Sequence, residues 1–286
     1  PKIHSSSTLL ELDISYTGIS GELPYSIGNL SSLNRLNLQG CQFSGPVPDS
    51  VGNLTQIRML DFSENNFTGY IPSTISKLKQ LTSLDLSSNS FRGEIPDVFS
   101  NLQQLRYLYL SNNSFIGPFP SSILSLTQLE SLDLSSNSLS GPLPSNVSML
   151  PKLTQMDLFY NSLNGILPSW VFGLPSLTFV RLHHNRFSGI ANELKTNPAL
   201  LYLHLSHNQI SGSFPQSLAN LTSLSELDLS SNNITGDDVG INITFPNLDY
   251  LFLSSCQLVD FPNFLRNVKT LSVLDISNNK IRGQIP

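Results

Sequence analysis

The residues of this sequence best suited to chemistry gather between positions 155 and 207. The stretch 181–189 reads RLHHNRFSG, where a matching stretch at 85–93 reads DLSSNSFRG. Arg181, His183 and His184 therefore replace an aspartate and two serines, and four of the five histidines lie in this region. Imidazoles bind metals or change charge near neutral pH, whereas arginine and aromatic side chains supply much of the binding energy at protein interfaces. A zinc site is the less favoured interpretation, because no carboxylate joins the histidines at a suitable spacing.

The phrase LDLSS recurs along the chain, and some copies carry large or ionisable side chains in place of its Asp and Ser. Exposed aromatic residues on one surface are costly to solvate unless a partner covers them. The predicted ligand-binding residues are Tyr107, Tyr109, Gln155, Phe159, Tyr160, Phe179, Arg181, His183, His184, Tyr202, His204, His207, Tyr250 and Phe252. The alternative is that these side chains stack on one another across neighbouring strands and stabilise a sheet.

The recurrent Asp of the same phrase suggests paired carboxylates, as at Asp61 with Asp85 and Asp133 with Asp157. Acid–base catalysis is not expected from them, because they belong to the repeated pattern and no nucleophile or oxyanion hole accompanies them. They are expected to exchange hydrogen bonds with flanking serines such as Ser87 and to have raised pKa values through like-charge proximity. The sequence predicts no enzymatic activity, no cofactor and no metal site.

These residues belong to twelve copies of the pattern L-x-x-L-x-L-x-x-N-x-L-x-G-x-I-P, spaced by 24 residues or, twice, by 23. The copies begin at Leu9, Leu33, Ile57, Leu81, Leu105, Leu129, Leu153, Leu177, Leu200, Leu224, Leu248 and Leu271. This period and leucine order are the signature of leucine-rich repeats, in which each unit adds a short parallel strand to a solenoid. Residues 1–286 are therefore predicted to form a single solenoid of twelve repeats, without N- or C-terminal caps.

Each repeat predicts a coil with one buried and one exposed strand face. In LTSLDLSSN the residues Leu81, Leu84 and Leu86 point inward, while Ser83 and Asp85 alternate outward. The Asn of the pattern is predicted to turn inward and to satisfy buried backbone groups of successive coils. It stands at Asn65, Asn89, Asn113, Asn137, Asn161, Asn185, Asn208, Asn232 and Asn279. Cys41 and Cys256 take the same position in repeats two and eleven, too far apart to form a disulfide.

The G-x-I-P ending resembles the plant extracellular class of leucine-rich repeats. That resemblance implies an α/β solenoid: a right-handed superhelix with a concave parallel β-sheet, a short second sheet and short helical turns on the convex side. Two connections depart from the pattern, since repeat eight runs FSGIANELKTNPAL without its Pro and repeat ten runs ITGDDVGINITFP.

Composition limits the partners of such a surface. Only 12% of the 286 residues are charged and the formal net charge is −5, so no nucleic-acid partner is expected. The sequence has no apolar run long enough for a membrane span and no signal peptide at its start, so a membrane anchor is expected outside this fragment.

Sequons predict glycosylation, which suits an extracellular protein. They occur at Asn29, Asn53, Asn66, Asn112, Asn146, Asn220, Asn233 and Asn242.

The stretch LFLSSCQLVDFPNFLRN at 251–267 resembles late repeats of plant receptor-like proteins, which are kinase-lacking cell-surface immune receptors. The resemblance implies an apoplastic recognition module that binds a pathogen-derived protein or peptide and signals through co-receptor kinases, by way of regions outside this fragment. Three alternatives remain open. They are a secreted inhibitor of a cell-wall-degrading glycosidase, similar to polygalacturonase-inhibiting proteins, the ectodomain of a peptide-hormone receptor kinase, and a protein that binds ice or a polysaccharide lattice.

Overall fold

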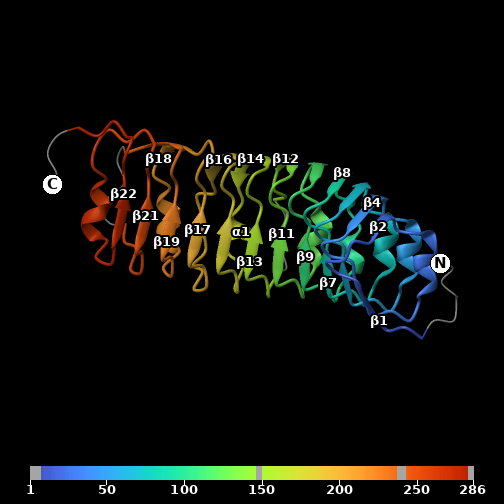
Figure 1. Ribbon diagram of the computed structural model, residues 1–286. Helices are drawn as coiled ribbons and strands as arrows, with labels where there is room; N and C mark the ends of the chain where they lie inside the picture. The colour runs from blue at the N-terminus through green and yellow to red at the C-terminus, as the bar shows by residue number, and fades with distance from the viewer. Residues whose placement is uncertain (1–7, 146–149, 237–242, 283–286) are drawn as a thin grey trace. The chain divides into compact units, whose positions relative to one another are not determined.

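The computed structural model describes residues 8–145, 150–236 and 243–282. The chain divides into two compact units, and each is a stack of similar coils (Figure 1). Unit 1 comprises Pro1–Leu139 and Met149–Leu153, and unit 2 comprises Ser140–Ser148 and Thr154–Pro286. That all twelve repeats form a single solenoid stays a prediction.

Each coil contributes one three-residue strand to a parallel sheet, called here the first sheet. In unit 1 its strands are β1 (Glu11–Asp13), β3 (Arg35–Asn37), β5 (Met59–Asp61), β7 (Ser83–Asp85), β9 (Tyr107–Tyr109) and β11 (Ser131–Asp133). In unit 2 they are β13 (Gln155–Asp157), β15 (Phe179–Arg181), β17 (Tyr202–His204), β19 (Glu226–Asp228), β21 (Tyr250–Phe252) and β22 (Val273–Asp275). The predicted alternation is confirmed: Leu84 is fully buried, while Ser83 and Asp85 on either side of it are half-buried.

A second parallel sheet forms where the chain leaves the Asn of each repeat. In unit 1 it contains β2 (Ser20–Glu22), β4 (Gln42–Pro46), β6 (Asn66–Gly69), β8 (Ser90–Glu94), β10 (Ser114–Gly117) and the first residues of β12 (Ser138–Pro142). In unit 2 the end of β12 pairs with β14 (Ser162–Leu167), and β14 pairs with β16 (Arg186–Ile190). The strands β18 (Ser211–Ser213) and β20 (Asn233–Thr235) form a separate pair.

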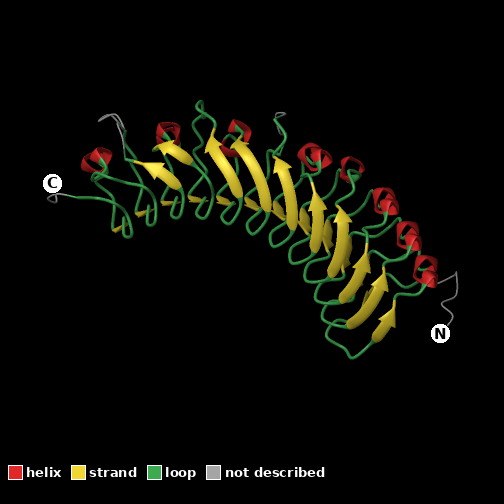
Figure 2. Ribbon diagram, turned by 90° about the horizontal axis from the view of Figure 1, so that it is seen from above, coloured by secondary structure: helices red, strands yellow, loops and turns green. Residues whose placement is uncertain are grey.

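Short helical turns close the side of each unit that faces away from the first sheet (Figure 2). They are η1 (Tyr25–Asn29), η2 (Asp49–Asn53), η3 (Ser73–Lys77), η4 (Phe99–Asn101), η5 (Ser121–Ser125), α1 (Ser169–Phe172), η6 (Gln216–Asn220) and η7 (Asn263–Asn267). Most of them follow the Pro of G-x-I-P directly. In η1, for example, the carbonyl of Pro24 accepts the first bond of the turn from the Ile27 N–H at 2.9 Å. Proline suits this position because its φ is fixed and it has no N–H to satisfy.

The eighth coil differs from the others in the connection that follows its second-sheet strand. Its second-sheet strand ends at Ile190 and is followed by Ala191 and Asn192, where most other coils have a large apolar residue and Pro, and no helix forms before the next strand in the described residues 191–201. Instead the buried Asn197 donates bonds to the carbonyls of Phe172 and Leu174, and its Oδ1 accepts the N–H of Ala199. The Asn197 amide therefore links this connection to the C-terminal end of α1 (Ser169–Phe172) in the preceding coil.

The asparagine of the repeat pattern bridges successive coils, as predicted. Asn89 donates from Nδ2 to the carbonyl of Phe62 in the preceding coil at 2.8 Å, and its Oδ1 accepts the N–H of Phe67 at 2.9 Å. The thiols of Cys41 and Cys256 replace part of this interaction by donating to the carbonyls of Ile14 and Leu229 at 3.1 and 3.4 Å. Both cysteines are buried and free, and burial raises the pKa of the Cys256 thiol.

The residue before this Asn adopts the left-handed conformation in every coil. The position has φ between 50° and 55° in eleven coils, and Gly40 takes it in the remaining one with φ 64°. This backbone geometry is unfavourable for bulky residues, by roughly 1–2 kcal/mol. It is nevertheless occupied by Tyr160, His184 and His207 in unit 2.

The Asn bridge generates a stability prediction. Asn185 donates to the carbonyl of Leu158 at 2.9 Å and accepts the N–H of Leu163 at 3.0 Å, both in buried surroundings. Asn185→Ala leaves two buried backbone groups unsatisfied and is expected to lower the free energy of unfolding by about 2–4 kcal/mol. Urea unfolding followed by circular dichroism measures this. The control Asn164→Ala, at an exposed position of the preceding coil, is expected to stay within about 0.5 kcal/mol of wild type. An equal loss in both variants would contradict the bridge.

Candidate functional site

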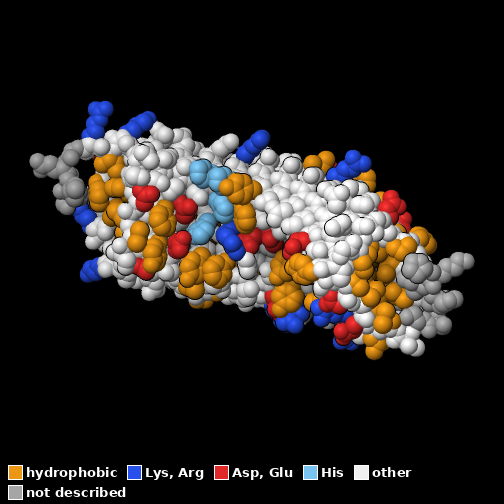
Figure 3. Space-filling view, in the orientation of Figure 1, with side chains coloured by type: hydrophobic (Ala, Val, Ile, Leu, Met, Phe, Trp, Pro, Cys, Tyr) orange, Lys and Arg blue, Asp and Glu red, His pale blue; other side chains and the backbone are white. Residues whose placement is uncertain are grey.

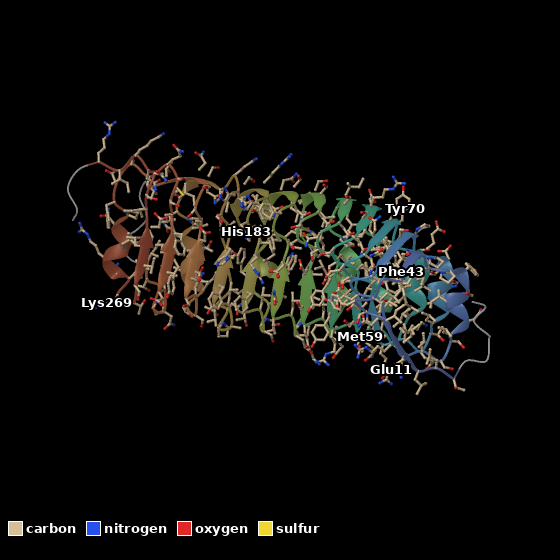
Figure 4. The ribbon with its side chains drawn as sticks, in the orientation of Figure 1. Glu11, Phe43, Met59, Tyr70, His183 and Lys269 are labelled. Atoms are coloured by element: carbon tan, nitrogen blue, oxygen red, sulfur yellow. The ribbon has the colours of Figure 1, made fainter. Side chains whose placement is uncertain are left out.

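The outward positions of β13, β15 and β17, with the residues that follow each strand, bring most of the predicted binding residues together in unit 2 (Figures 3 and 4). Corresponding positions of successive coils lie in register, as for Phe179 with Tyr202 and Arg181 with His204. Adjacent strands are about 4.8 Å apart, so planar side chains at equivalent positions can stack. We call the resulting surface the ring patch. It comprises Phe159, Tyr160, Phe179, His183, His184, Tyr202, His204 and His207.

The rings of this patch form three columns. Phe179 stacks on Tyr202 with centroids 4.4 Å apart and 2° between the planes. Phe159 stacks on His183 at 4.7 Å. His184 lies between Tyr160 and His207, at 4.1 Å from each. The mutual stacking that the sequence left as an alternative therefore occurs.

Stacking does not remove the ring patch from solvent. Tyr160 keeps 51% of its surface exposed and Phe179 keeps 38%. The faces of the rings are covered by neighbouring rings, while edges remain accessible, so one arrangement can both stabilise the sheet and present a contact surface.

Charged groups hold the patch in place. Arg181 forms a salt bridge from Nε to Oδ1 of Asp157 at 2.8 Å, and its guanidinium carbon lies 5.9 Å from the centroid of the Phe159 ring. Gln155 donates from Nε2 to the other carboxylate oxygen of Asp157 at 2.7 Å. The Asp157 side chain is only 5% exposed. Arg181 therefore compensates a buried carboxylate and at the same time fixes the edge of the patch.

Two imidazoles of the patch, those of His183 and His184, have lowered pKa values. The pKa of His183 is lowered from 6.5 to about 4, first by burial and then by the nearby His184 and His204. Its Nδ1 is buried without a hydrogen-bond partner among the described residues. Burial and the neighbouring His207 also lower the pKa of His184. Both side chains therefore behave as neutral aromatic rings at neutral pH.

The other predicted residues lie outside the patch. Tyr250 and Phe252 belong to β21 of unit 2, where Tyr250 is 38% exposed. Tyr107 and Tyr109 belong to unit 1, where the Tyr107 hydroxyl donates to Glu130 at 3.0 Å and Arg106 bonds the same carboxylate. The bond to Glu130 raises the pKa of Tyr107.

Two partners of the patch were not identified from the sequence. Glu226 contacts Nε2 of His204 at 2.8 Å, and Asp157 pairs with Arg181. The available signal was the placement of Glu226 at an outward position, immediately beside Tyr202 in the next coil. A hollow of about 480 Å³ between β16 and β18, lined in part by Ile190, Gly212 and Phe214, was also not predicted.

The recurrent aspartates have a structural role. Oδ1 of Asp61 and Oδ1 of Asp85 each accept bonds from the backbone N–H and the hydroxyl of a serine two residues later. The pKa of Asp85 is raised, mainly by burial and less by the charges of Asp61 and Asp133. Like-charge proximity, the cause expected from the sequence, is therefore the smaller contribution.

The predicted glycosylation sites are exposed wherever the structure describes them: Asn29, Asn53, Asn66, Asn112, Asn220 and Asn233. Asn146 and Asn242 lie outside the described residues. In the described part of the chain, no three His, Cys, Asp or Glu side chains are placed to hold a metal ion. None of the helices described has the length and apolar character needed to cross a bilayer.

The chain belongs to the leucine-rich-repeat family. Residues 94–284 match the family model described as a leucine-rich repeat region, and residues 8–30, 32–54 and 47–91 match models of single or paired repeats. No curated protein sequence gives a significant match.

Solved structures of plant receptors are similar to this chain. The plant peptide hormone receptor RGFR1, in complex with RGF2, is 27% identical with a TM-score of 0.81, over 97% of this chain and 49% of that receptor. PEPR1 in its complex with AtPEP1 is 29% identical with a TM-score of 0.74, over 98% of this chain and 43% of PEPR1. The chain thus spans less than half the length of each receptor. A plant ice-binding protein is 30% identical with a TM-score of 0.61, over 89% of this chain and 74% of that protein.

The buried imidazole of His183 predicts a pH-dependent stability. Because its folded pKa is about 4 and its unfolded value is 6.5, the unfolded chain binds more protons between these values. The contribution of the neutral His183 ring to the free energy of unfolding is therefore fully present above pH 6.5 and is lost as the pH drops towards 4. Partial exposure of the ring reduces the expected loss to the order of 1–2 kcal/mol.

Urea unfolding at pH 7 and pH 4.5 tests this contribution. His183→Ser, which introduces the residue found at the equivalent Ser87, is expected to show a smaller fall in the unfolding midpoint than wild type. Tyr202→Ser, which removes a ring of the patch and leaves His183 in place, is the control and should keep the wild-type fall. The same fall in the His183 variant as in wild type would refute the assignment.

Proposed function

We propose that this chain is the extracellular ligand-recognition region of a plant cell-surface receptor and that the ring patch contacts a protein or peptide ligand. The observation that carries the proposal is the set of stacked, half-exposed rings braced by the Arg181–Asp157 pair. Rings held in place before binding lose little conformational entropy on binding, and aromatic side chains with arginine are the residues that most often dominate interface energies.

Two of the similar solved structures are plant receptors in complex with RGF2 and AtPEP1, which supports a peptide-sized partner. The resemblance of residues 251–267 to receptor-like proteins supports the finer proposal. In it, the complete protein is a glycosylated, kinase-lacking receptor on the apoplastic side of the plasma membrane. It binds a pathogen-derived ligand, signals through co-receptor kinases and catalyses no reaction.

Ice binding is the second candidate, because a plant ice-binding protein is similar over most of its length. Lattice binding requires a flat and chemically uniform array. The first sheet of unit 2 is instead interrupted by rings and by Arg181, and the second sheet carries the exposed side chains of Arg92, Glu94 and Arg186. Strong inhibition of ice recrystallisation at low protein concentration would favour this candidate over the receptor.

The ring patch is tested by returning it to the repeat consensus. The variant Phe179→Ser/His183→Ser/His184→Ser has the residues found at Ser83, Ser87 and Ser88, so the coil is expected to fold. Ligand is captured from pathogen culture filtrates with the complete ectodomain and identified by mass spectrometry, and its affinity is then measured by calorimetry. The triple variant is expected to weaken binding by about 30-fold or more, equivalent to one hot-spot residue.

The matched control for this test is Tyr70→Ser, which removes a ring that is 64% exposed outside the first sheet. It is expected to bind like wild type. Full affinity in the triple variant, with circular dichroism showing a folded protein, would place the ligand elsewhere and refute the proposal.

A further inference from the structure

The strand β19 carries two carboxylates, and each lies in register between aromatic side chains of the neighbouring strands. Glu226 is flanked by Tyr202 and Tyr250. Asp228 is flanked by His204 and Phe252. We call these six residues the β19 cluster; it adjoins the ring patch and includes two of its members.

The outward positions of the first sheet in unit 2 have an excess of negative charge. The six strands present four carboxylates, Asp157, Glu226, Asp228 and Asp275, and one guanidinium, Arg181. Arg181 is already used by Asp157. Asp228 and Asp275 make no salt bridge with any described residue.

Asp228 still has the capacity to bind a cation. Its Oδ1 accepts the N–H of Ser230 at 2.9 Å, which is the local bond that the consensus aspartates make throughout the fold. Its charge also acts on His183 in the ring patch, where it raises the imidazole pKa against the larger effect of burial. Because Asp228 lies in register with His204 and Phe252, on strands about 4.8 Å away on either side, one ligand group can contact the carboxylate and a neighbouring ring.

At two other places in the fold, an arginine of the protein pairs with a carboxylate and lies beside an aromatic ring. Arg181 pairs with Asp157 at 2.8 Å and lies 5.9 Å from the Phe159 ring. In unit 1, Arg106 pairs with Glu130 at 2.8 Å and lies 5.5 Å from the Tyr107 ring. The β19 cluster has the rings and the carboxylates, but its only basic side chain is the imidazole of His204 at Glu226.

We infer that the ligand supplies the missing guanidinium, so that an arginine side chain of the bound peptide pairs with Asp228 and lies against the rings of the β19 cluster. A planar guanidinium both stacks on aromatic faces and donates paired hydrogen bonds to a carboxylate, which an ammonium group does less well. This inference rests on the proposed function, because it specifies the chemistry of the ligand at the same surface.

The test is an NMR titration of the isotope-labelled protein with N-acetyl-arginine amide. Saturable shifts are expected at the backbone amides of Glu226, Asp228 and Phe252. N-acetyl-citrulline amide, which has nearly the same shape without the charge, is expected to bind at least 10-fold more weakly, and N-acetyl-lysine amide at least 3-fold more weakly. Citrulline or lysine probes that bind as well as the arginine probe would overturn the inference.

Asp228→Asn retains an Oδ1 for the Ser230 N–H and removes the charge, and it is expected to weaken the arginine probe by 5- to 10-fold. Asp61→Asn is the matched control, because Asp61 makes the same local bond with Ser63 but lies in register between Asn37 and Asp85 rather than between rings. Wild-type binding by Asp228→Asn would also overturn the inference.

The natural ligand separates this inference from the proposed function. If the ring-patch triple variant loses the ligand while Asp228→Asn binds it with wild-type affinity, the ring patch contacts the ligand but no ligand arginine pairs with Asp228. If both variants bind the ligand with wild-type affinity, the ring patch is not the ligand-binding surface, and the proposed function is refuted together with the inference.

Discussion

The hydrogen bonds between the asparagine side chain of one coil and the backbone of the coil before it are the interaction on which the rest of the structure depends. The three-residue strands pair only part of the backbone of each coil, and the chain that follows each strand still has carbonyl and N–H groups to satisfy. Asn89 and its equivalents donate to one backbone carbonyl and accept one N–H across the coil boundary, which also fixes the spacing of neighbouring coils. That spacing in turn lets equivalent side chains stack, as the phenylalanines at positions 67, 91 and 115 do inside unit 1 at 6.2 Å.

The sequence was sufficient for features that follow from the repeat period: the inward and outward positions, the bridging asparagine and its cysteine replacements. It was insufficient to predict which side chains of successive coils form pairs. The repeat pattern aligns Asp157 with Asp133, but the side chain that pairs with Asp157 is Arg181. The pattern does not single out Glu226, whose carboxylate lies 2.8 Å from Nε2 of His204. Such pairs depend on rotamers and burial, and neither is encoded in spacing. Likewise, the missing Pro of the eighth coil predicted an irregular connection, but nothing indicated that Asn197 would donate to the carbonyls of Phe172 and Leu174 in the preceding coil.

Stacking and recognition are compatible uses of the same rings. A column such as Tyr160–His184–His207 buries ring faces that would otherwise be hydrated and limits the rotamers of each member. The low pKa of His183 has the same origin, since a ring enclosed by other rings is poorly solvated as a cation. The surface is therefore rigid and largely uncharged at its centre, with negative charge at the β19 side.

The left-handed residue of each coil has an evolutionary consequence. Its backbone conformation is set by the coil, since φ stays near 50–55° whether the side chain is Ser, Glu, Asn, Tyr or His. A substitution there changes what the surface displays without redirecting the chain. Mutations at this position can therefore change the contact surface one residue at a time while the direction of the chain stays the same.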